Sequence, residues 1–323
     1  MENQLIKLEN LGSALDVERL NLFLFPTEKC NFRCTYCYED HRIGKMSPAL
    51  IGGIKKLLLV RFNDLKRLDI SWFGGEPLLA KELIYDISDF ILNNAPKSLD
   101  YAGNITTNGY NLNGRTFEKL IKYKITYFQI SLDGDRLMHD QTRIRKDKNP
   151  TFDVIWNNLI NMKSTDYEFS VLIRIHFTYD NYIHLDSLIQ KINVEFGDDL
   201  RFKVFFKPIE RLGGVNDKLI KTMNKEEKRV IKKLLDEKIW NKDQIFSVDE
   251  KKPYVCYASV PNSFIIRANG DVCKCTVALN NSKNLVGKIN ENGEILFNEN
   301  FYLWLKGIET LNLETLACPL KSI

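Results

Sequence analysis

The sequence lacks a strong net charge, long apolar runs and low-complexity segments, and each absence excludes a class of protein. Its 46 Lys and Arg against 42 Asp and Glu leave a net charge of +4, and the basic residues are scattered, which argues against a nucleic-acid partner. No stretch approaches the roughly 18 apolar residues of a membrane span, and residues 1–11 alternate in charge, unlike a signal peptide. We therefore expect a cytoplasmic globular protein without a nucleic-acid or membrane partner.

The seven cysteines fall into two groups at opposite ends of the chain. They are Cys30, Cys34 and Cys37 near the start, and Cys256, Cys273, Cys275 and Cys318 in the last quarter. A chain without an export signal is expected in a compartment where thiols stay reduced. Clustered cysteines there more often bind metal or act in catalysis than form disulfides. The odd number also argues against complete internal pairing.

Short apolar runs predict six buried strands, which alternate with segments of helical period. The runs are Leu20–Phe25, Leu68–Phe73, Tyr101–Thr106, Thr126–Leu132, Ser170–Phe177 and Arg201–Phe206. Helix starts are predicted at Ser47-Pro48, Thr116, Thr151 and Asn224. This alternation indicates right-handed βαβ units and a parallel sheet, either open and doubly wound or closed into a partial barrel.

The pattern changes beyond about residue 244 to short strands and turns. Phe264–Ala268 and Asp271–Ala278 flank Asn269-Gly270 and predict a hairpin whose turn has two positive-φ positions, and a second hairpin surrounds Asn292-Gly293. This pattern predicts a small appended domain that carries four of the cysteines. The predicted organisation is an N-terminal extension over 1–19, a core over 20–245 and an auxiliary domain over 246–323.

Four short motifs follow the first four predicted strands. They are the cysteine triplet, Gly74-Gly75-Glu76-Pro77, Thr106-Thr107-Asn108-Gly109 and Ser131-Leu132-Asp133-Gly134. Because ligands of open sheets and barrels alike bind at the carboxyl ends of the strands, these motifs predict one site.

The spacing Cys30-x3-Cys34-x2-Cys37 fits a loop wrapped around a compact metal centre. Zinc is one candidate, with His41 as the fourth ligand of a Cys3His set. A four-iron cluster is the other, and three cysteines would leave one of its irons open. The spacing favours the cluster, because zinc ligands usually come as two pairs separated by a longer loop.

The run CNFRCTYCYE, followed by WFGGEPLL, TTNG and SLDG, resembles the radical S-adenosylmethionine (SAM) superfamily over roughly residues 20–245. The C-terminal part resembles the SPASM or twitch extension of its peptide-modifying branch. The resemblance implies an α/β fold, a partial (β/α)6 TIM-like barrel with a small auxiliary iron-sulfur domain. It also implies that Cys30, Cys34 and Cys37 bind a [4Fe-4S] cluster whose open iron binds SAM.

Further SAM contacts follow from the resemblance by matching positions. Tyr36 would lie near the adenine, Ser131 and Asp133 would form a polar pair near the ribose or carboxylate, and Arg143 would hold the SAM carboxylate, with Arg145 as a competing candidate. Gly74, Gly75 and Glu76 would approach the SAM ammonium group. Asn108 fits the family motif but also a plain turn, and His139 and His176 are expected to be structural.

The resemblance implies at least one auxiliary cluster in the C-terminal domain, bound by Cys256, Cys275 and Cys318. Cys273 is a further candidate ligand, and it is expected to share a cluster with Cys275 only if a bulge or turn intervenes between them. The family's next cysteine would fall just beyond Ile323. The sequence is therefore expected to be a truncated chain or a natural form with one auxiliary cluster.

The resemblance further implies reductive cleavage of SAM and oxidation of a residue in a ribosomally made peptide, giving a crosslink or thioether. Expected partners are the precursor peptide, an electron donor such as flavodoxin or ferredoxin and, if a leader must be recognised, a separate leader-binding protein. Sulfatase maturation is an alternative, although Thr276 stands where those relatives carry an aspartate. The sequence is also compatible with an iron-sulfur electron carrier and with radical chemistry on a small molecule.

Overall fold

The computed structural model describes Gly12, residues 14–246 and residues 254–323, and it divides the chain into two compact units. Unit 1 comprises Met1–Lys29, His41–Gly103 and Val248–Ile323, and unit 2 comprises Cys30–Asp40 and Asn104–Ser247. Most of the predicted extension 1–19, and residues 247–253 beside the predicted boundary at 246, lie outside the described residues. The predicted domain limits stay a prediction.

Unit 1 is built on a run of strands in the order β12-β11-β10-β9-β1-β3, with the first half of β4 next to β3. Strand β1 pairs in parallel with both β3 and β9, so a strand from the end of the chain extends the sheet directly beside the first strand. The strands are β1 (Arg19–Leu24), β3 (Arg67–Trp72), β4 (Asp100–Thr107), β9 (Ser263–Ile266), β10 (Asp271–Cys273), β11 (Leu285–Ile289) and β12 (Ile295–Phe297).

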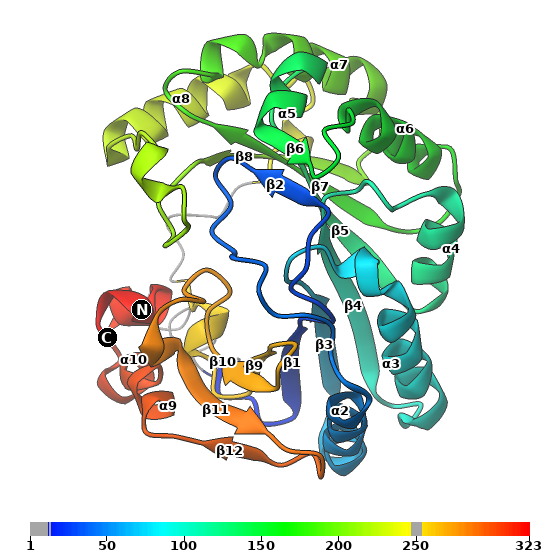
Figure 1. Cartoon of the computed structure of the whole chain (residues 1–323), viewed down its shortest axis with the longest axis vertical. Coiled ribbons are helices and arrows are strands. Elements are labelled where there is room, and N and C mark those ends of the chain that lie inside the picture. Colours follow the sequence, from blue (N-terminus) through cyan, green and yellow to red (C-terminus); the bar gives the residue numbers. More distant parts are fainter. Residues whose placement is uncertain (1–11, 13, 247–253) are drawn as a thin grey trace. The chain divides into compact units, whose positions relative to one another are not determined.

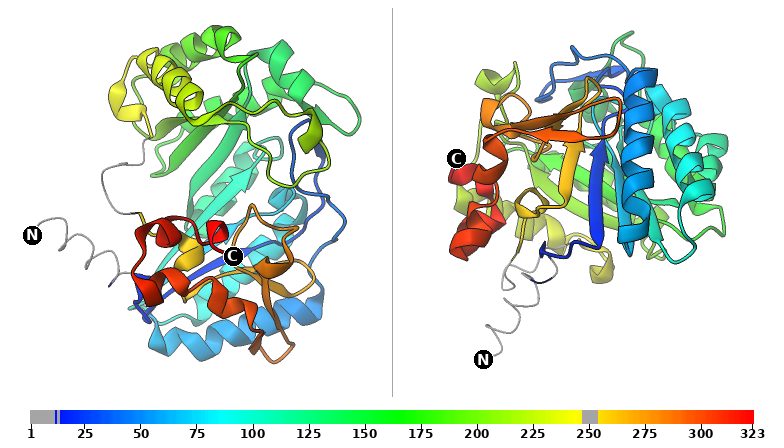
Figure 2. Two further views of the ribbon diagram at one scale, coloured as in Figure 1. Left: turned by 90° about the vertical axis from the view of Figure 1, so that its left-hand side faces the viewer. Right: turned by 90° about the horizontal axis from the view of Figure 1, so that it is seen from below.

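The helices of unit 1 fall into an N-terminal pair and a C-terminal group. The pair is α2 (Pro48–Arg61) and α3 (Lys81–Asn94), and the group is α9 (Asn300–Leu303), α10 (Lys306–Thr310) and α11 (Leu313–Ala317). Figures 1 and 2 show these C-terminal helices, in orange to red, close together, and α9 contacts β11. No helix within the described ranges has the length and apolar character to cross a membrane.

Unit 2 contains the second half of β4 and then β5, β7 and β8, and the last three pair in parallel. Its strands are β2 (Phe32–Cys34), β5 (Ile125–Leu132), β6 (Arg143–Arg145), β7 (Ser170–Phe177) and β8 (Phe202–Pro208). Its helices are α4 (Gly114–Lys122), α5 (Arg136–Thr142), α6 (Phe152–Lys163), α7 (Asp186–Phe196) and α8 (Lys225–Glu237). In Figure 1, α6 and α7 lie outside β5, β7 and β8, while β2 lies inside them. The predicted α/β class with a mostly parallel sheet and all six of its predicted strands are confirmed.

One predicted helix start differs from the structure, and a second, at Thr151, is confirmed in position but is not capped by its own side chain. Helix α4 begins at Gly114, because the Asn113 side chain accepts a hydrogen bond from Thr116 N and acts as the N-cap. Thr151 does precede α6, but its side chain does not cap the helix; Asp140 Oδ1 instead accepts from the backbone nitrogens of Thr151 and Phe152 at 2.8 and 3.0 Å. The starts at Ser47-Pro48 and Asn224 are confirmed by their caps.

Both C-terminal hairpins form, as β9–β10 and β11–β12. The expectation of two positive-φ residues in the first turn is wrong, since of Asn269 and Gly270 only Gly270 has a positive φ, of 85°. The Asn269 side chain explains the difference: its Oδ1 accepts a hydrogen bond from Asp271 N at 3.1 Å and so closes the turn without a left-handed backbone.

A buried ion pair joins the end of β1 to this hairpin in unit 1. Glu28 is 2% exposed, and its carboxylate accepts from Arg267 Nε and Nη2 at 3.1 and 2.5 Å and from Ala268 N at 3.3 Å. The pair fixes the chain two residues before Cys30. A buried carboxylate with three donors should contribute more than a surface pair.

We predict that Glu28→Gln lowers the free energy of unfolding by about 2 kcal/mol, because it removes the charge from hydrogen bonds to a guanidinium. Urea unfolding at unchanged m-value measures the loss. Glu18→Gln is the matched control, since the Glu18–Lys66 pair is largely exposed and should contribute little. Equal effects of the two substitutions would contradict a stabilising role for the buried pair.

Candidate functional site

The cysteine triplet lies in unit 2 on a loop that a short β-ribbon anchors. Strand β2 pairs antiparallel with β6, so that Cys34 stands opposite Arg143 and Phe32 opposite Arg145. Thr35 N donates to Thr142 O at 2.9 Å, and Cys37 N donates to Cys34 O at 3.1 Å, which closes a turn between the second and third cysteines. The ribbon thus fixes the first half of the loop against the segment that follows α5.

The three thiols differ in burial, and two of them, Cys34 and Cys37, lie where burial disfavours the charged form. Cys30 is buried and its Sγ accepts from Phe32 N at 3.3 Å, while Cys34 and Cys37 are partly exposed. Burial raises the pKa of Cys34, and it raises the pKa of Cys37 to about 12. Among the described residues no three Cys, His, Asp or Glu side chains are gathered as a metal-binding group, but Cys34 and Cys37 are close enough to act on each other electrostatically.

Tyr36, between the second and third cysteines, is held by three side chains from distant parts of unit 2. Its hydroxyl donates to Asp133 Oδ2 at 2.5 Å and accepts from Arg143 Nη1 at 2.8 Å. Its ring lies against the His176 ring, with 4.9 Å between centroids. The structure therefore brings together Tyr36, Asp133 and Arg143 of the predicted site, and it adds His176.

The Asp133 carboxylate, 1% exposed, is the centre of this network. Besides Tyr36 it faces His176 Nδ1 at 3.0 Å and Thr142 Oγ1 at 3.0 Å. Burial alone would raise the pKa of Asp133, but the His176 hydrogen bond and the nearby Arg143 charge hold it below its usual range. Because an ionised carboxylate only accepts, Nδ1 of His176 carries the proton of that bond.

His176 is more than the structural residue expected from the sequence, because it contacts two predicted site residues. Burial lowers the pKa of His176 to about 4, so its ring is neutral at pH 7. His139 fits the structural expectation: its ring packs on Phe152, and its Nδ1 accepts from Asp133 N at 3.4 Å.

Arg143 and Arg145 differ clearly in their surroundings. Arg143 is 7% exposed, donates to Tyr36, lies over the Phe32 ring, and keeps a buried Nε without a hydrogen-bond partner in the described part of the chain. Arg145 pairs with Asp147 at 2.8 Å and stacks on Tyr110. Of the two, Arg143 has the free donor that a bound carboxylate requires.

Two further residues of unit 2 support the cysteine loop. Asn108 Nδ2 donates to Asn31 Oδ1 at 2.8 Å, which ties the end of β4 to the residue after Cys30. Gly214, after β8, packs so closely that a Cβ there would lie 2.5 Å from the carbonyl oxygen of Cys37. Only glycine allows this approach. The pair Gly213-Gly214 indicates a loop in the sequence, but nothing in it predicts contact with the cysteine loop.

The Gly-Gly-Glu-Pro motif belongs to unit 1. Gly75 has a φ of +42°, and a Cβ there would lie 2.4 Å from the Lys29 carbonyl oxygen, so the motif requires glycine next to the segment that leads into the cysteine loop. Glu76 is fully buried, and its Oε1 accepts from Leu78 N at 2.9 Å as the cap of a short turn. His41, the possible zinc ligand, also belongs to unit 1, where its Nδ1 lies 3.2 Å from Glu28 O.

The four C-terminal cysteines also belong to unit 1. Cys256, Cys275 and Cys318 are electrostatic neighbours, and burial raises the pKa of Cys256 to about 11. Cys256 N donates to Leu316 O at 2.9 Å, which links it to the helix that ends before Cys318. The fully buried Asn284 holds the Cys275 backbone by accepting from its nitrogen and donating to its oxygen, each at 2.8 Å.

Cys273 has a different setting. It packs with Phe25 and Ile265 in a hydrophobic cluster, and burial raises its pKa to about 12. An irregularity of the β10–β11 pairing does fall between Val272 and Cys273. Cys273 nevertheless faces apolar side chains, so its part in a metal site stays a prediction.

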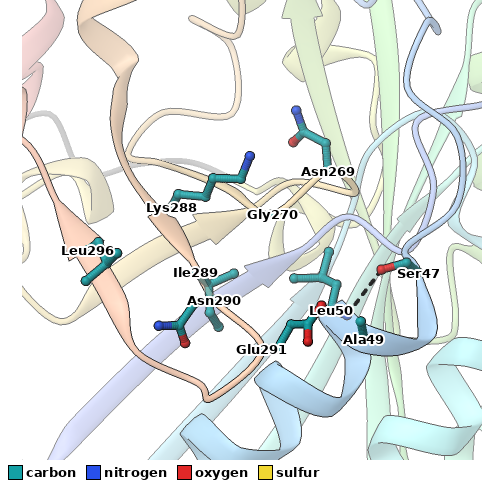
Figure 3. A pocket seen from close by; sticks show the side chains of 10 residues that line it. All are labelled: Ser47, Ala49, Leu50, Asn269, Gly270, Lys288, Ile289, Asn290, Glu291 and Leu296. Carbon is teal, nitrogen blue, oxygen red and sulfur yellow. Dashed lines mark hydrogen bonds between the residues drawn. The ribbon is translucent and has the colours of Figure 1, made fainter.

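A hollow of about 340 Å³ lies elsewhere in unit 1, between the start of α2 and the β9–β10 and β11–β12 turns (Figure 3). Ser47, Leu50, Asn269 and Lys288 are among its lining residues. No residue predicted for the site is among the described residues that line it, so it is a groove between surface elements and not the candidate site.

A family model described as the Radical SAM superfamily matches residues 24–192, more than half of the chain. Among curated proteins, a cysteine-type anaerobic sulfatase-maturating enzyme from Clostridium novyi is 23% identical over 236 residues, which cover 70% of this chain and 61% of that enzyme. The chain thus spans less than two thirds of the length of this relative.

Solved structures share the fold at low identity. The protein anSMEcpe with bound AdoMet and a Cp18Cys peptide is 19% identical with a TM-score of 0.65, over 88% of this chain and 80% of that one. Streptococcus suis SuiB bound to the precursor peptide SuiA is 17% identical with a TM-score of 0.61, over 100% of this chain and 74% of that one.

Proposed function

Because this chain belongs to the radical SAM superfamily, we propose that it cleaves SAM reductively and oxidises a residue of a ribosomally made peptide, forming a crosslink or thioether. The observation that carries the proposal is the cysteine loop of unit 2, in which Tyr36 is bound by Asp133 and Arg143. An electron carrier would have no reason to keep a buried arginine donor free beside its cysteines.

The family implies a [4Fe-4S] cluster and SAM, and the residues fit both. Cys30, Cys34 and Cys37 supply three sulfur ligands on one loop, and a backbone N–H already points at the Cys30 sulfur. Since burial raises the pKa values of Cys34 and Cys37, thiolates at these places need a positive partner, which iron provides. A cluster held by Cys30, Cys34 and Cys37 would supply the electron for the reductive cleavage of SAM.

The chain's own residues bind and orient in this proposal. Arg143 holds the SAM carboxylate with its guanidinium, while Tyr36, fixed by Asp133 and His176, supplies a rigid ring at the predicted adenine position. The resemblance to the family implies that Gly74, Gly75 and Glu76 approach the SAM ammonium group and that Ser131 contributes a hydroxyl.

We also propose an auxiliary iron-sulfur cluster bound by Cys256, Cys275 and Cys318. Three buried or partly buried thiols that influence one another electrostatically support it, as does the Asn284 side chain that fixes the Cys275 backbone. Such a cluster would take the second electron that an oxidised substrate must lose. Flavodoxin or ferredoxin would supply the first electron to the SAM-binding cluster.

A precursor peptide as substrate is supported by the peptides in the two similar solved structures. A separate leader-binding protein is proposed for the case in which a leader must be recognised.

Sulfatase maturation is the second candidate, favoured by the similarity to the Clostridium novyi enzyme. Against it, Thr276 stands where those relatives carry an aspartate. Its hydroxyl is already used in a hydrogen bond of 2.8 Å with the Tyr257 hydroxyl.

The test is anaerobic incubation of reconstituted protein with SAM, dithionite and the peptide encoded beside the gene. We predict 5'-deoxyadenosine and a peptide lighter by two hydrogens, because crosslinking removes a hydrogen from each joined atom. Mass spectrometry with and without SAM checks both products. A sulfatase peptide whose cysteine becomes formylglycine would select sulfatase maturation, and 5'-deoxyadenosine without any peptide change would reject peptide modification.

A further inference from the structure

Arg174 is a positively charged residue that no motif marks and the network around Tyr36 does not use. It lies in the middle of β7, where it stands in register with Ser131 of β5 and Phe205 of β8. Because alternate residues of a strand share a face, Arg174 points to the same side of the sheet as His176. That side carries the candidate site, and the electrostatic neighbours of Arg174 include Tyr38, Tyr36 and Asp133.

The charge of Arg174 lacks a compensating partner. Its Nε is buried and makes no hydrogen bond to any described residue. Asp133 is a carboxylate that acts on Arg174, but it is already bound by Tyr36, His176 and Thr142. Arg143 adds a second positive charge nearby. Two guanidiniums therefore share one fully engaged carboxylate.

Arg174 is partly exposed as a residue, but its buried Nε lacks a hydrogen-bond partner in the described part of the chain, which is costly because arginine stays charged in proteins. Burial accordingly lowers the pKa of Arg174. A protein keeps such a group where a ligand supplies the counter-charge, as in the bidentate binding of carboxylates by arginine. Arg174 thus has the properties of an anion-binding residue.

We propose that Arg174 binds an acidic side chain, Asp or Glu, of the peptide substrate and so selects where the peptide is modified. The proposal rests on the proposed function, of which it specifies the substrate class. SAM brings a carboxylate too, but Arg143 is placed for it, opposite Cys34 on the ribbon and with its own free Nε. Arg174 instead has Tyr38, the residue after the last cysteine of the loop, as its strongest electrostatic neighbour.

The first arm of the test measures the unpaired charge without any peptide. Arg174→Met should raise the melting temperature of the reconstituted protein, because an apolar side chain of similar length replaces an uncompensated cation. Arg201→Met is the control of opposite sign: Arg201 pairs with Asp199 and donates to backbone oxygens, so its loss should lower the melting temperature. A lower melting temperature for Arg174→Met would mean that Arg174 is a structural residue and would overturn the proposal.

The second arm measures recognition with two matched probes, N-acetyl-Ala-Glu-Ala-amide and its Gln counterpart, in the presence of SAM. The wild type should bind the Glu peptide about tenfold more tightly, which corresponds to one charge-assisted hydrogen bond, and Arg174→Met should lose this preference. Absence of the preference in the wild type would overturn the proposal. So would weaker SAM binding by Arg174→Met, which would place Arg174 on the cofactor. Neither readout depends on SAM cleavage, so this inference can fail while the proposed function stands.

Discussion

Replacing Cys30, Cys34 and Cys37 together with alanine will remove about four iron atoms per chain and abolish SAM cleavage, because no other sulfur lies on that loop to bind the cluster. The β2–β6 ribbon is held by backbone hydrogen bonds, and the Tyr36 network does not involve the thiols. The variant should therefore stay folded. Iron and sulfide analysis after anaerobic reconstitution, together with 5'-deoxyadenosine measured by chromatography, checks the prediction.

Cys273→Ala is the matched control for the triple variant. Its thiol packs against Phe25 and Ile265, so the substitution should reduce stability slightly while SAM cleavage continues. Iron that remains in the triple variant should come from the C-terminal cysteines, and its Mössbauer spectrum tests the proposed auxiliary cluster. An unchanged iron content or unchanged SAM cleavage in the triple variant would contradict the assignment of the first three cysteines.

Asp133→Ala should lower the free energy of unfolding by roughly 3 to 5 kcal/mol, the usual cost of leaving one side of a buried charged network unpaired. The substitution leaves the Tyr36 hydroxyl, the His176 Nδ1 proton and the Arg143 charge without their shared acceptor. Tyr36 would lose its fixed orientation beside Cys37, so SAM affinity should fall as well. Urea unfolding and equilibrium binding of SAM measure the two effects separately.

Asp135→Ala, two residues away, separates loss of the network from loss of a simple cap. Asp135 accepts a hydrogen bond from Met138 N as the N-cap of α5, and its removal should reduce stability by about 1 kcal/mol without affecting SAM binding. If Asp133→Ala lowered the free energy of unfolding no more than Asp135→Ala does, the buried network would contribute no more to stability than a single helix cap.

The sequence predicts the local elements well because strands, caps and turns depend on neighbouring residues. All six core strands and the start of α8 at Asn224 follow from such signals. The failures come from competition between side chains. Asn113 is a better N-cap than Thr116 because its oxygen reaches the free nitrogen of the first turn, and Asn269 closes a turn that was expected to need two positive-φ residues.

The long-range part of the site could not be predicted in this way. Nothing in the sequence around Tyr36 indicates that its hydroxyl will meet Asp133, and His176 carries no motif of its own. The parallel pairing of β1 with β9 joins residues from opposite ends of the chain, which no local pattern encodes. Gly214 and Arg174 were missed for the same reason, since their importance lies in what the fold brings near them.

The central claim is that the Cys30, Cys34 and Cys37 loop holds an iron-sulfur cluster to which SAM binds directly. Electron paramagnetic resonance of the reduced, reconstituted protein tests it most directly, when spectra are recorded before and after SAM is added. We expect a reduced-cluster signal whose g-values shift on addition of SAM in the wild type, and no such signal change in the triple cysteine variant. A wild-type spectrum that SAM leaves unchanged would show that SAM does not bind to a cluster on this loop.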